Sequence, residues 1–293
     1  MSELKLSVEH LFDGAQICHQ KTIVVKNALI TNIENSIASG KDILAGTLIP
    51  GFIDVQVNGG GGYQFNQSPN LETIQQIGRA HQNFGTTGWL PTLITDSLEQ
   101  MHKAADAVAA ARIAQVPGVL GIHFEGPHLS TSKKGVHAEG FIRELSQSER
   151  NLYSRKDLGK IVLTLAPENV APEIITELVA AGVIVCLGHS NASFEQTEAA
   201  LLAGASGFTH LFNAMSAFTS REPGMVGAAL LDQKSFCGLI VDGIHVHPAA
   251  ALLAIKAKKN IMLVTDAMSP VGVDQKSFEF FGQQIQRDNN RLT

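Results

Sequence analysis

The chain has 293 residues, of which 44% are hydrophobic and 17% charged, with a net charge of −5 at pH 7. This balance is typical of a folded α/β protein with one large domain, alone or with a small companion. The acidic charge argues against nucleic acid as a partner, and no apolar run is long enough to cross a bilayer. The three cysteines are scattered, and the N-terminus lacks the pattern of a secretory signal, so we predict a cytoplasmic protein.

The first 47 residues differ in pattern from the rest of the chain. Short apolar runs, such as Lys21–Val25 and Ala28–Ile33, are separated by Asn, Gly and Ser. This spacing is typical of a few antiparallel strands. We therefore predict a small β-sandwich domain over residues 1–47, present as its N-terminal half only, and a second domain over residues 48–293.

From residue 48 onward, compact apolar runs alternate with Ala-rich stretches of helical spacing. The eight runs are Phe52–Val57, Gly88–Leu93, Val119–Phe124, Ile161–Leu165, Val183–Leu187, Gly207–Leu211, Cys237–Val241 and Ile261–Val264. The helical stretches are Leu71–Phe84, Leu98–Ala114, Pro172–Ala181, Phe194–Ala203 and Pro248–Lys258. Nearly continuous apolar runs are typical of parallel strands buried on both faces. The alternation predicts a (β/α)₈ barrel, with a doubly wound sheet as the alternative.

Metal-ligand side chains follow several of these predicted strands. Glu125 directly follows the third run, His189 follows the fifth, and His210 lies at the end of the sixth. One carboxylate and two imidazoles make a three-ligand catalytic metal set. Asp266 follows the eighth run and is placed to transfer a proton. Because strand ends of a barrel converge at one end, we expect these four residues to meet there.

Each of these residues also has a simpler interpretation. A single His after a strand is more often a loop residue than a ligand, Glu125 fits a helix-capping acid, and Asp266 fits an ordinary N-cap. Arg221 lies in a polar loop, and its spacing does not distinguish phosphate binding from a surface position. The joint pattern favours a metal site, since several consecutive strand ends carry polar residues of metal-ligand type.

Six motifs together resemble one known family. They are PGFIDVQVNGGGG from Pro50, GIHFEGPHLSTSKKGVH from Gly121, LGHSNAS from Leu187, GFTHLFNAMSAFTSREPGMVG from Gly207, GLIVDGIHVHP from Gly238 and LVTDAMSPVG from Leu263. The sequence resembles the N-acetylglucosamine-6-phosphate deacetylases of the amidohydrolase superfamily. The resemblance implies hydrolysis of the N-acetyl group of N-acetylglucosamine 6-phosphate to glucosamine 6-phosphate and acetate, a step of amino-sugar catabolism.

The resemblance also implies residue roles. Glu125, His189 and His210 would hold one divalent metal ion per subunit, and Asp266 would be the catalytic acid and base. His137 would help polarise the acetyl carbonyl. The substrate contacts would be Val136, Asn213, Ala214, Arg221 and His245, with Arg221 reaching the site of a neighbouring subunit in a homodimer. Zinc is the default for such a ligand set, and iron, cobalt or manganese also suit it.

The end of the first barrel strand bears on the number of metal ions. Most amidohydrolases carry His-x-His there, whereas this chain reads Gln56-Val57-Asn58. Amides are poor zinc ligands, so we expect one ion rather than two. The alternatives are a binuclear cyclic amidase such as a dihydroorotase or hydantoinase, a deacetylase of a related N-acyl amino sugar, and a sugar-phosphate binder without activity.

The last stretch of the chain departs from the family pattern. Residues 275–293 predict a hairpin, with Phe278–Phe281 and Gln284–Gln286 around Gly282, and no amphipathic helix follows. We expect a barrel without its last helix, from a truncated chain with weak or absent activity. Comparing its intact mass with the encoding gene tests this expectation.

Overall fold

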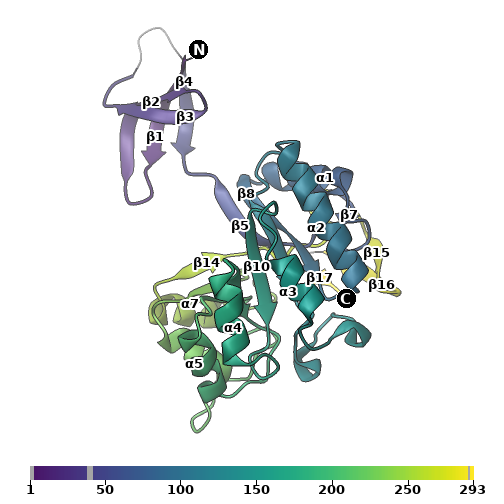
Figure 1. The fold of residues 1–293 in the computed structure, drawn as a ribbon. Coiled ribbons are helices and arrows are strands. Elements are labelled where there is room, and N and C mark those ends of the chain that lie inside the picture. The colour runs from purple at the N-terminus through teal and green to yellow at the C-terminus, as the bar shows by residue number, and fades with distance from the viewer. Residues whose placement is uncertain (1–2, 38–41, 290) are drawn as a thin grey trace. The chain divides into compact units, whose positions relative to one another are not determined.

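The computed structural model describes residues 3–37, 42–289 and 291–293 (Figure 1). The chain forms two compact units, Met1–Phe52 and Ile53–Thr293. The described part of the first unit is one four-stranded sheet in the order β3-β2-β1-β4. Its strands are β1 (Glu3–Phe12), β2 (Ile17–Lys26), β3 (Leu29–Glu34) and β4 (Ile43–Leu48). The first three strands pair antiparallel, as predicted, but β4 lies parallel to β1.

The second unit is built on an eight-stranded parallel sheet. Its strands are β5 (Phe52–Val57), β8 (Thr86–Ile94), β9 (Gly121–Glu125), β10 (Lys160–Leu165), β11 (Ile184–Leu187), β12 (Gly207–Phe208), β13 (Phe236–Leu239) and β14 (Ile261–Leu263). Neighbours in the sheet follow chain order from β5 to β14. Each strand lies within or overlaps one of the eight predicted runs. The (β/α)₈ barrel expected from the alternation is therefore confirmed.

Helices connect most of these strands. They are α1 (Leu71–Gln82), α2 (Leu98–Ile113), α3 (Gln147–Tyr153), α4 (Pro172–Ala180), α5 (Phe194–Leu202), α6 (Gly224–Leu231) and α7 (Pro248–Ala257). Side-chain caps start several of them: Asn70, Ser97, Ser146 and Ser193 each accept a backbone N–H of the first turn. None of the helices in the described ranges is long and apolar enough to cross a membrane.

Two short elements complete the second unit. One is a small antiparallel ribbon of β6 (Gly59–Gly60) and β7 (Tyr63–Gln64), which follows β5. The predicted C-terminal hairpin is present as β15 (Ser277–Phe280) and β16 (Gln283–Asp288), with β17 (Arg291–Leu292) pairing to β16. Phe278 and Phe280 of this hairpin pack against Ile94 at the end of β8.

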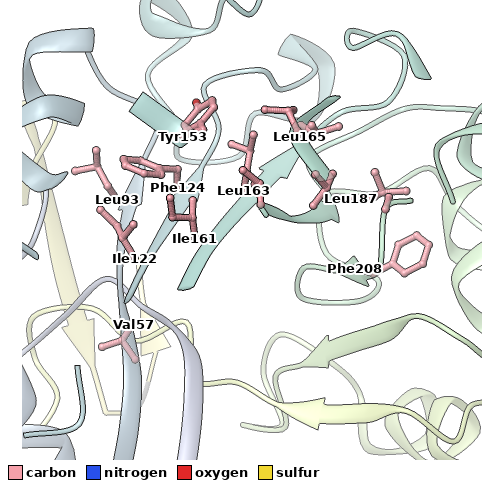
Figure 2. Close-up of a cluster of buried hydrophobic side chains, with 14 of the residues drawn as sticks. Val57, Leu93, Ile122, Phe124, Tyr153, Ile161, Leu163, Leu165, Leu187 and Phe208 are labelled. Atoms are coloured by element: carbon pink, nitrogen blue, oxygen red, sulfur yellow. The ribbon is translucent and has the colours of Figure 1, made fainter. Parts of the chain in front are cut away.

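The two faces of the barrel strands have different surroundings. On β9, Ile122 and Phe124 belong to the main core, and the Phe124 ring lies 5.4 Å from that of Tyr153 in α3 (Figure 2). Side chains alternate along a strand, so His123 and Glu125 take the opposite face. There His123 Nε2 lies 2.8 Å from Thr164 Oγ1 of β10. This alternation directs Glu125 into the barrel interior.

Asp54 joins the first and last strands of the barrel. Its carboxylate accepts the Thr265 hydroxyl at 2.6 Å and the Thr265 backbone N–H at 3.3 Å. It also accepts the Gln56 backbone N–H at 3.1 Å. Nearby, Val57 and Ala267 form a parallel bridge. The seam between β5 and the segment after β14 therefore depends on a buried carboxylate, whose pKa burial raises above its ordinary value.

We expect Asp54→Ala to lower the free energy of unfolding by about 2–4 kcal/mol, because the Thr265 hydroxyl and the backbone N–H groups of Gln56 and Thr265 lose a buried acceptor at once. Urea titration followed by circular dichroism measures this change. The control is Asp106→Ala, which removes an exposed ion pair with Arg155 and should cost less than about 1 kcal/mol. Equal losses for the two variants would contradict a special role for the seam.

Candidate metal centre and active site

Three buried side chains from separate strand ends converge in the barrel. His189 Nε2 lies 3.1 Å and His210 Nε2 3.0 Å from Glu125 Oε1. The two Nε2 atoms are 2.9 Å apart. Within the described ranges, this is the one group of three or more His, Cys, Asp or Glu side chains whose arrangement could hold a metal ion. The structure thus brings together the three ligands expected from the sequence.

The backbone at these positions takes an uncommon conformation. The φ angles are +47° at His189, +35° at His210 and +50° at Asp266. Residues other than glycine seldom adopt this left-handed region, at a cost of roughly 1–3 kcal/mol each. The conformation occurs directly after β11, β12 and β14, where the chain leaves the barrel. Packing in the rest of the fold must offset this cost, a pattern found at functional sites.

The charges in this cluster favour a bound cation. Burial alone would raise the pKa of Glu125, but hydrogen bonds from His189 and His210 hold it well below its usual range. Burial lowers the pKa of His210, yet the hydrogen bond and charge of Glu125 outweigh it and raise that pKa to about 9. The cluster therefore stabilises a positive charge between the carboxylate and the rings, either as a proton or as a metal ion.

The tautomer of His189 also suits a metal ligand. Its Nδ1 lies 2.8 Å from the backbone oxygen of Lys133. A carbonyl oxygen can only accept, so Nδ1 carries a proton in the neutral and in the charged ring. Nε2 is therefore the nitrogen that can give up its proton, which it shares with Glu125, and offer a lone pair to a metal ion. Backbone contacts of this kind orient metal-binding imidazoles in proteins. The donor set, two ring nitrogens and one carboxylate, fits a divalent metal ion.

Gln56 and Asn58 place N–H donors on the two carboxylates of the site. Gln56 Nε2 donates to Glu125 Oε1 at 3.0 Å, and Asn58 Nδ2 donates to Asp266 Oδ1 at 2.6 Å. If either side-chain amide were flipped by 180°, its oxygen would face a carboxylate oxygen and repel it. The hydrogen bonds therefore fix the orientation of both amides. An N–H group repels a cation. The side of the site that faces β5 is therefore unsuited to a second metal ion.

Asp266 stands next to the cluster at the barrel seam. Its backbone N–H donates to the Gln56 carbonyl oxygen at 3.0 Å. Burial and the charge of Glu125 raise the pKa of its carboxyl group above the ordinary value. A raised pKa brings a carboxylate nearer to the proton affinity that general acid–base catalysis requires at neutral pH.

His137 lies beside the cluster in the long segment after β9. Its ring is 4.3 Å from that of His189 and is almost fully buried. Burial and the charge of His189 hold its pKa well below its ordinary value, so the ring is neutral. Its Nδ1 lies 2.8 Å from Thr95 Oγ1. Thr95 could not be predicted from the sequence as a site residue, because a single Thr after a strand is not distinctive.

The remaining expected site residues lie outside the helices and strands of the barrel. Asn213 and Ala214 follow His210, and the Ala214 oxygen accepts the Ser190 backbone N–H at 3.0 Å. Val136, next to His137, is largely exposed. Arg221 is exposed, and no hydrogen bond or ion pair within the described ranges joins it to the cluster. His245 is exposed and pairs through Nδ1 with Asp242 at 2.7 Å.

The chain is similar to known amide hydrolases. Residues 47–291 match the profile of the Amidohydrolase family. The N-acetylgalactosamine-6-phosphate deacetylase of Shewanella sp. (strain ANA-3) is 51% identical over 96% of this chain and 75% of that protein. The N-acetylglucosamine-6-phosphate deacetylase of Haemophilus influenzae is 37% identical over 83% of this chain and 65% of that protein. This chain thus spans about two thirds to three quarters of these relatives.

A solved structure extends the similarity to the fold. The N-acetylglucosamine-6-phosphate deacetylase from Pasteurella multocida matches with a TM-score of 0.93 at 34% identity, over 99% of this chain and 78% of that one. Barrel, ligand cluster and profile together define the class of amidohydrolases. Within this class, the chain belongs to the family of the amino-sugar-6-phosphate deacetylases. The family resemblance inferred from the six motifs is therefore confirmed.

Proposed function

We propose that this chain hydrolyses the N-acetyl group of N-acetylglucosamine 6-phosphate, releasing glucosamine 6-phosphate and acetate. The observation that carries the proposal is the buried cluster of Glu125, His189 and His210 with Asp266 beside it. The printed activities of the relatives at 51% and 37% identity support the substrate class. A cytoplasmic location is proposed with it, since the three cysteines are unpaired, as expected in a reducing compartment.

Glu125, His189 and His210 would hold one divalent metal ion, with zinc as the expected metal. When bound, such an ion polarises an amide carbonyl and lowers the pKa of water. The proton of His189 at Nδ1 is held by the Lys133 oxygen. Its Nε2 is thereby kept available as a ligand.

Asp266 would move the proton. As a carboxylate, it removes a proton from the attacking water while the oxygen of that water bonds to the acetyl carbon. It then gives the proton to the sugar nitrogen as the C–N bond breaks, which leaves an amine and acetic acid. The acid passes its remaining proton to the amine or to water and becomes acetate. Asn58 holds Oδ1 of Asp266 at 2.6 Å, so Oδ2 is the oxygen that would carry the proton.

His137 would stabilise the developing negative charge. The attack on the acetyl carbon transfers charge to its oxygen, and a neutral ring N–H can donate a hydrogen bond to that oxygen. Donors aimed at such an oxyanion contribute roughly 100- to 1000-fold to rate in other hydrolases. Burial keeps His137 neutral, so it acts as a donor and not as an acid.

The sugar and its phosphate would be held by the surrounding loops. Val136, Asn213, Ala214 and His245 are the proposed contacts in the same subunit. Arg221 is exposed, which suits a guanidinium that reaches the phosphate in the site of a second copy. We therefore propose a homodimer. Sedimentation equilibrium tests the oligomeric state.

N-acetylgalactosamine 6-phosphate is the second candidate substrate. The relative at 51% identity is named for that sugar, whereas the relatives at 37% are named for either sugar. The two substrates differ in the configuration of one hydroxyl group. Release of acetate from both, at matched concentrations, decides between them by the ratio of kcat/KM.

The same assay tests the proposed function. We expect deacetylation of at least one of the two sugar phosphates. We also expect much weaker deacetylation of N-acetylglucosamine without the phosphate, because the phosphate supplies binding energy. Hydrolysis of cyclic amides such as dihydroorotate or hydantoin, with neither sugar phosphate turned over, would contradict the proposal.

Metal content provides a separate prediction. We expect about one divalent ion per chain by atomic emission, because Gln56 and Asn58 present N–H groups where a second ion would need lone pairs. Two ions per chain would contradict this and would favour a binuclear cyclic amidase. The matched test is the double variant Gln56→His and Asn58→His, which should bind more than one divalent ion per chain.

A further inference from the structure

We propose that Thr95 is a positioning residue that holds His137 with its Nε2 as the hydrogen-bond donor to the substrate. The inference rests on the proposed role of His137 in the deacetylation. Thr95 directly follows β8, whereas His137 lies in the segment after β9. The contact therefore joins two loops at the same end of the barrel.

The backbone of Thr95 contacts the ring of His137. Its N–H points to His137 Nδ1 at 3.3 Å. A backbone N–H can only donate, so Nδ1 must accept and cannot carry a proton. A neutral imidazole has one proton, which must then reside on Nε2. The Thr95 hydroxyl lies 2.8 Å from Nδ1 and 3.4 Å from the Glu125 backbone oxygen, and it has one proton to donate. Because Nδ1 is unprotonated and is the nearer acceptor, the hydroxyl donates to Nδ1 and strengthens the same arrangement.

The opposite edge of the ring is available for a substrate. Within the described part of the chain, Nε2 of His137 has no hydrogen-bond partner, yet it is not among the atoms sealed from solvent. With the proton on Nε2, that edge donates to a carbonyl oxygen. With the proton on Nδ1, it would present a lone pair to the oxygen and repel it. The tautomer therefore decides whether His137 helps or hinders the reaction.

The surroundings hold Thr95 in place. Its side chain is buried, and its hydroxyl also lies 3.4 Å from the Glu125 backbone oxygen. A Cβ at Gly126 would come within 2.2 Å of Thr95 Oγ1. Only glycine at position 126 allows this approach. The Thr95 hydroxyl is thus held against the backbone of Glu125 and Gly126.

The test compares Thr95→Val with Thr95→Ser in the zinc-loaded chain. Valine has the shape of threonine without the hydroxyl, whereas serine keeps the hydroxyl. We expect Thr95→Val to lower kcat by about tenfold, the effect of one lost buried hydrogen bond, with KM changed less than about threefold. Thr95→Ser should restore most of kcat, because rescue requires the hydroxyl and not the shape.

Nitrogen NMR of the histidine rings gives a readout that does not depend on activity. The signals of His137 are identified by their loss in His137→Gln. In the unaltered chain we expect an unprotonated Nδ1 and a protonated Nε2, and in Thr95→Val a measurable shift of both nitrogens. The control is Thr92→Val on β8, whose hydroxyl binds the Val57 backbone N–H at 2.9 Å. It should leave the His137 signals unchanged.

The outcomes separate this inference from the proposed function. A protonated Nδ1 in the unaltered chain would overturn the inference, even if the chain deacetylates the sugar phosphate. Unchanged His137 signals in Thr95→Val would overturn it as well, and so would a loss of kcat that serine does not restore. If the unaltered chain has no deacetylase activity, the proposed function fails, and the NMR arm still decides the Thr95 contact.

Discussion

Asp266→Asn is expected to reduce kcat for deacetylation by about a thousandfold, within the range that general acid–base groups contribute. Asparagine has nearly the same shape and can still accept the hydrogen bond that Asn58 donates to Oδ1 at 2.6 Å. It cannot remove a proton from water or return one to the sugar nitrogen. The variant should therefore keep its fold and its metal ion while losing the chemical step.

Steady-state kinetics and atomic emission on the same sample measure this effect. The matched control is Asp96→Asn, another buried aspartate that follows a barrel strand and accepts hydrogen bonds from Asn66 and Ser97. We expect Asp96→Asn to affect stability more than kcat. Near-normal turnover by Asp266→Asn would disprove the proposed mechanism.

Glu125→Gln is expected to remove the metal ion and, with it, the activity. The substitution removes a negative charge that lies 3.1 Å from His189 Nε2 and 3.0 Å from His210 Nε2. Loss of a ligand should weaken metal binding by more than about 100-fold, the upper end for groups that only support a ligand. We expect less than one tenth of an ion per chain after gel filtration.

The same variant makes a second prediction for the metal-free chain. The pKa of His210 is raised to about 9 by the hydrogen bond and charge of Glu125, against burial, which lowers it. Without that charge and hydrogen bond, burial is opposed mainly by the charge of Asp266, so the pKa of His210 in Glu125→Gln should fall below its value in the unaltered chain. NMR titration of the metal-free protein measures this. Glu168→Gln is the control, because Glu168 binds Ser190 and Asn191 outside the cluster. Full metal retention by Glu125→Gln would contradict the proposed site.

The barrel could be predicted because its strands are local features. Each buried parallel strand is a nearly continuous apolar run, and all eight runs correspond to strands of the sheet. The helices with an apolar stripe or a proline start were predicted as well. Helix α6 was missed because Gly224–Ala229 is buried throughout, so it has no polar face to give a helical period. Helix α3 was missed as well, because its seven residues are too few to show a helical period.

The small N-terminal sheet shows another limit. Antiparallel strands were expected there, because short apolar runs separated by Asn, Gly and Ser are typical of them. Strand β4 instead lies parallel to β1, at the edge opposite β3. Parallel pairing joins segments that are distant in the chain, and an apolar pattern does not encode the direction of a partner.

For the candidate site, the residues could be predicted from the sequence, whereas the contacts between them could not. Glu125, His189, His210 and Asp266 could be chosen from the sequence because a ligand type after a buried strand is a local pattern, and barrel geometry brings such ends together. The contacts between these residues could not be chosen in this way. Asn58 and Asp266 are 208 residues apart and meet because the first strand pairs with the segment after the last. Hydrogen-bond partners across that seam, and the tautomers that Lys133 and Thr95 impose on two histidines, depend on distances that exist once the barrel has closed.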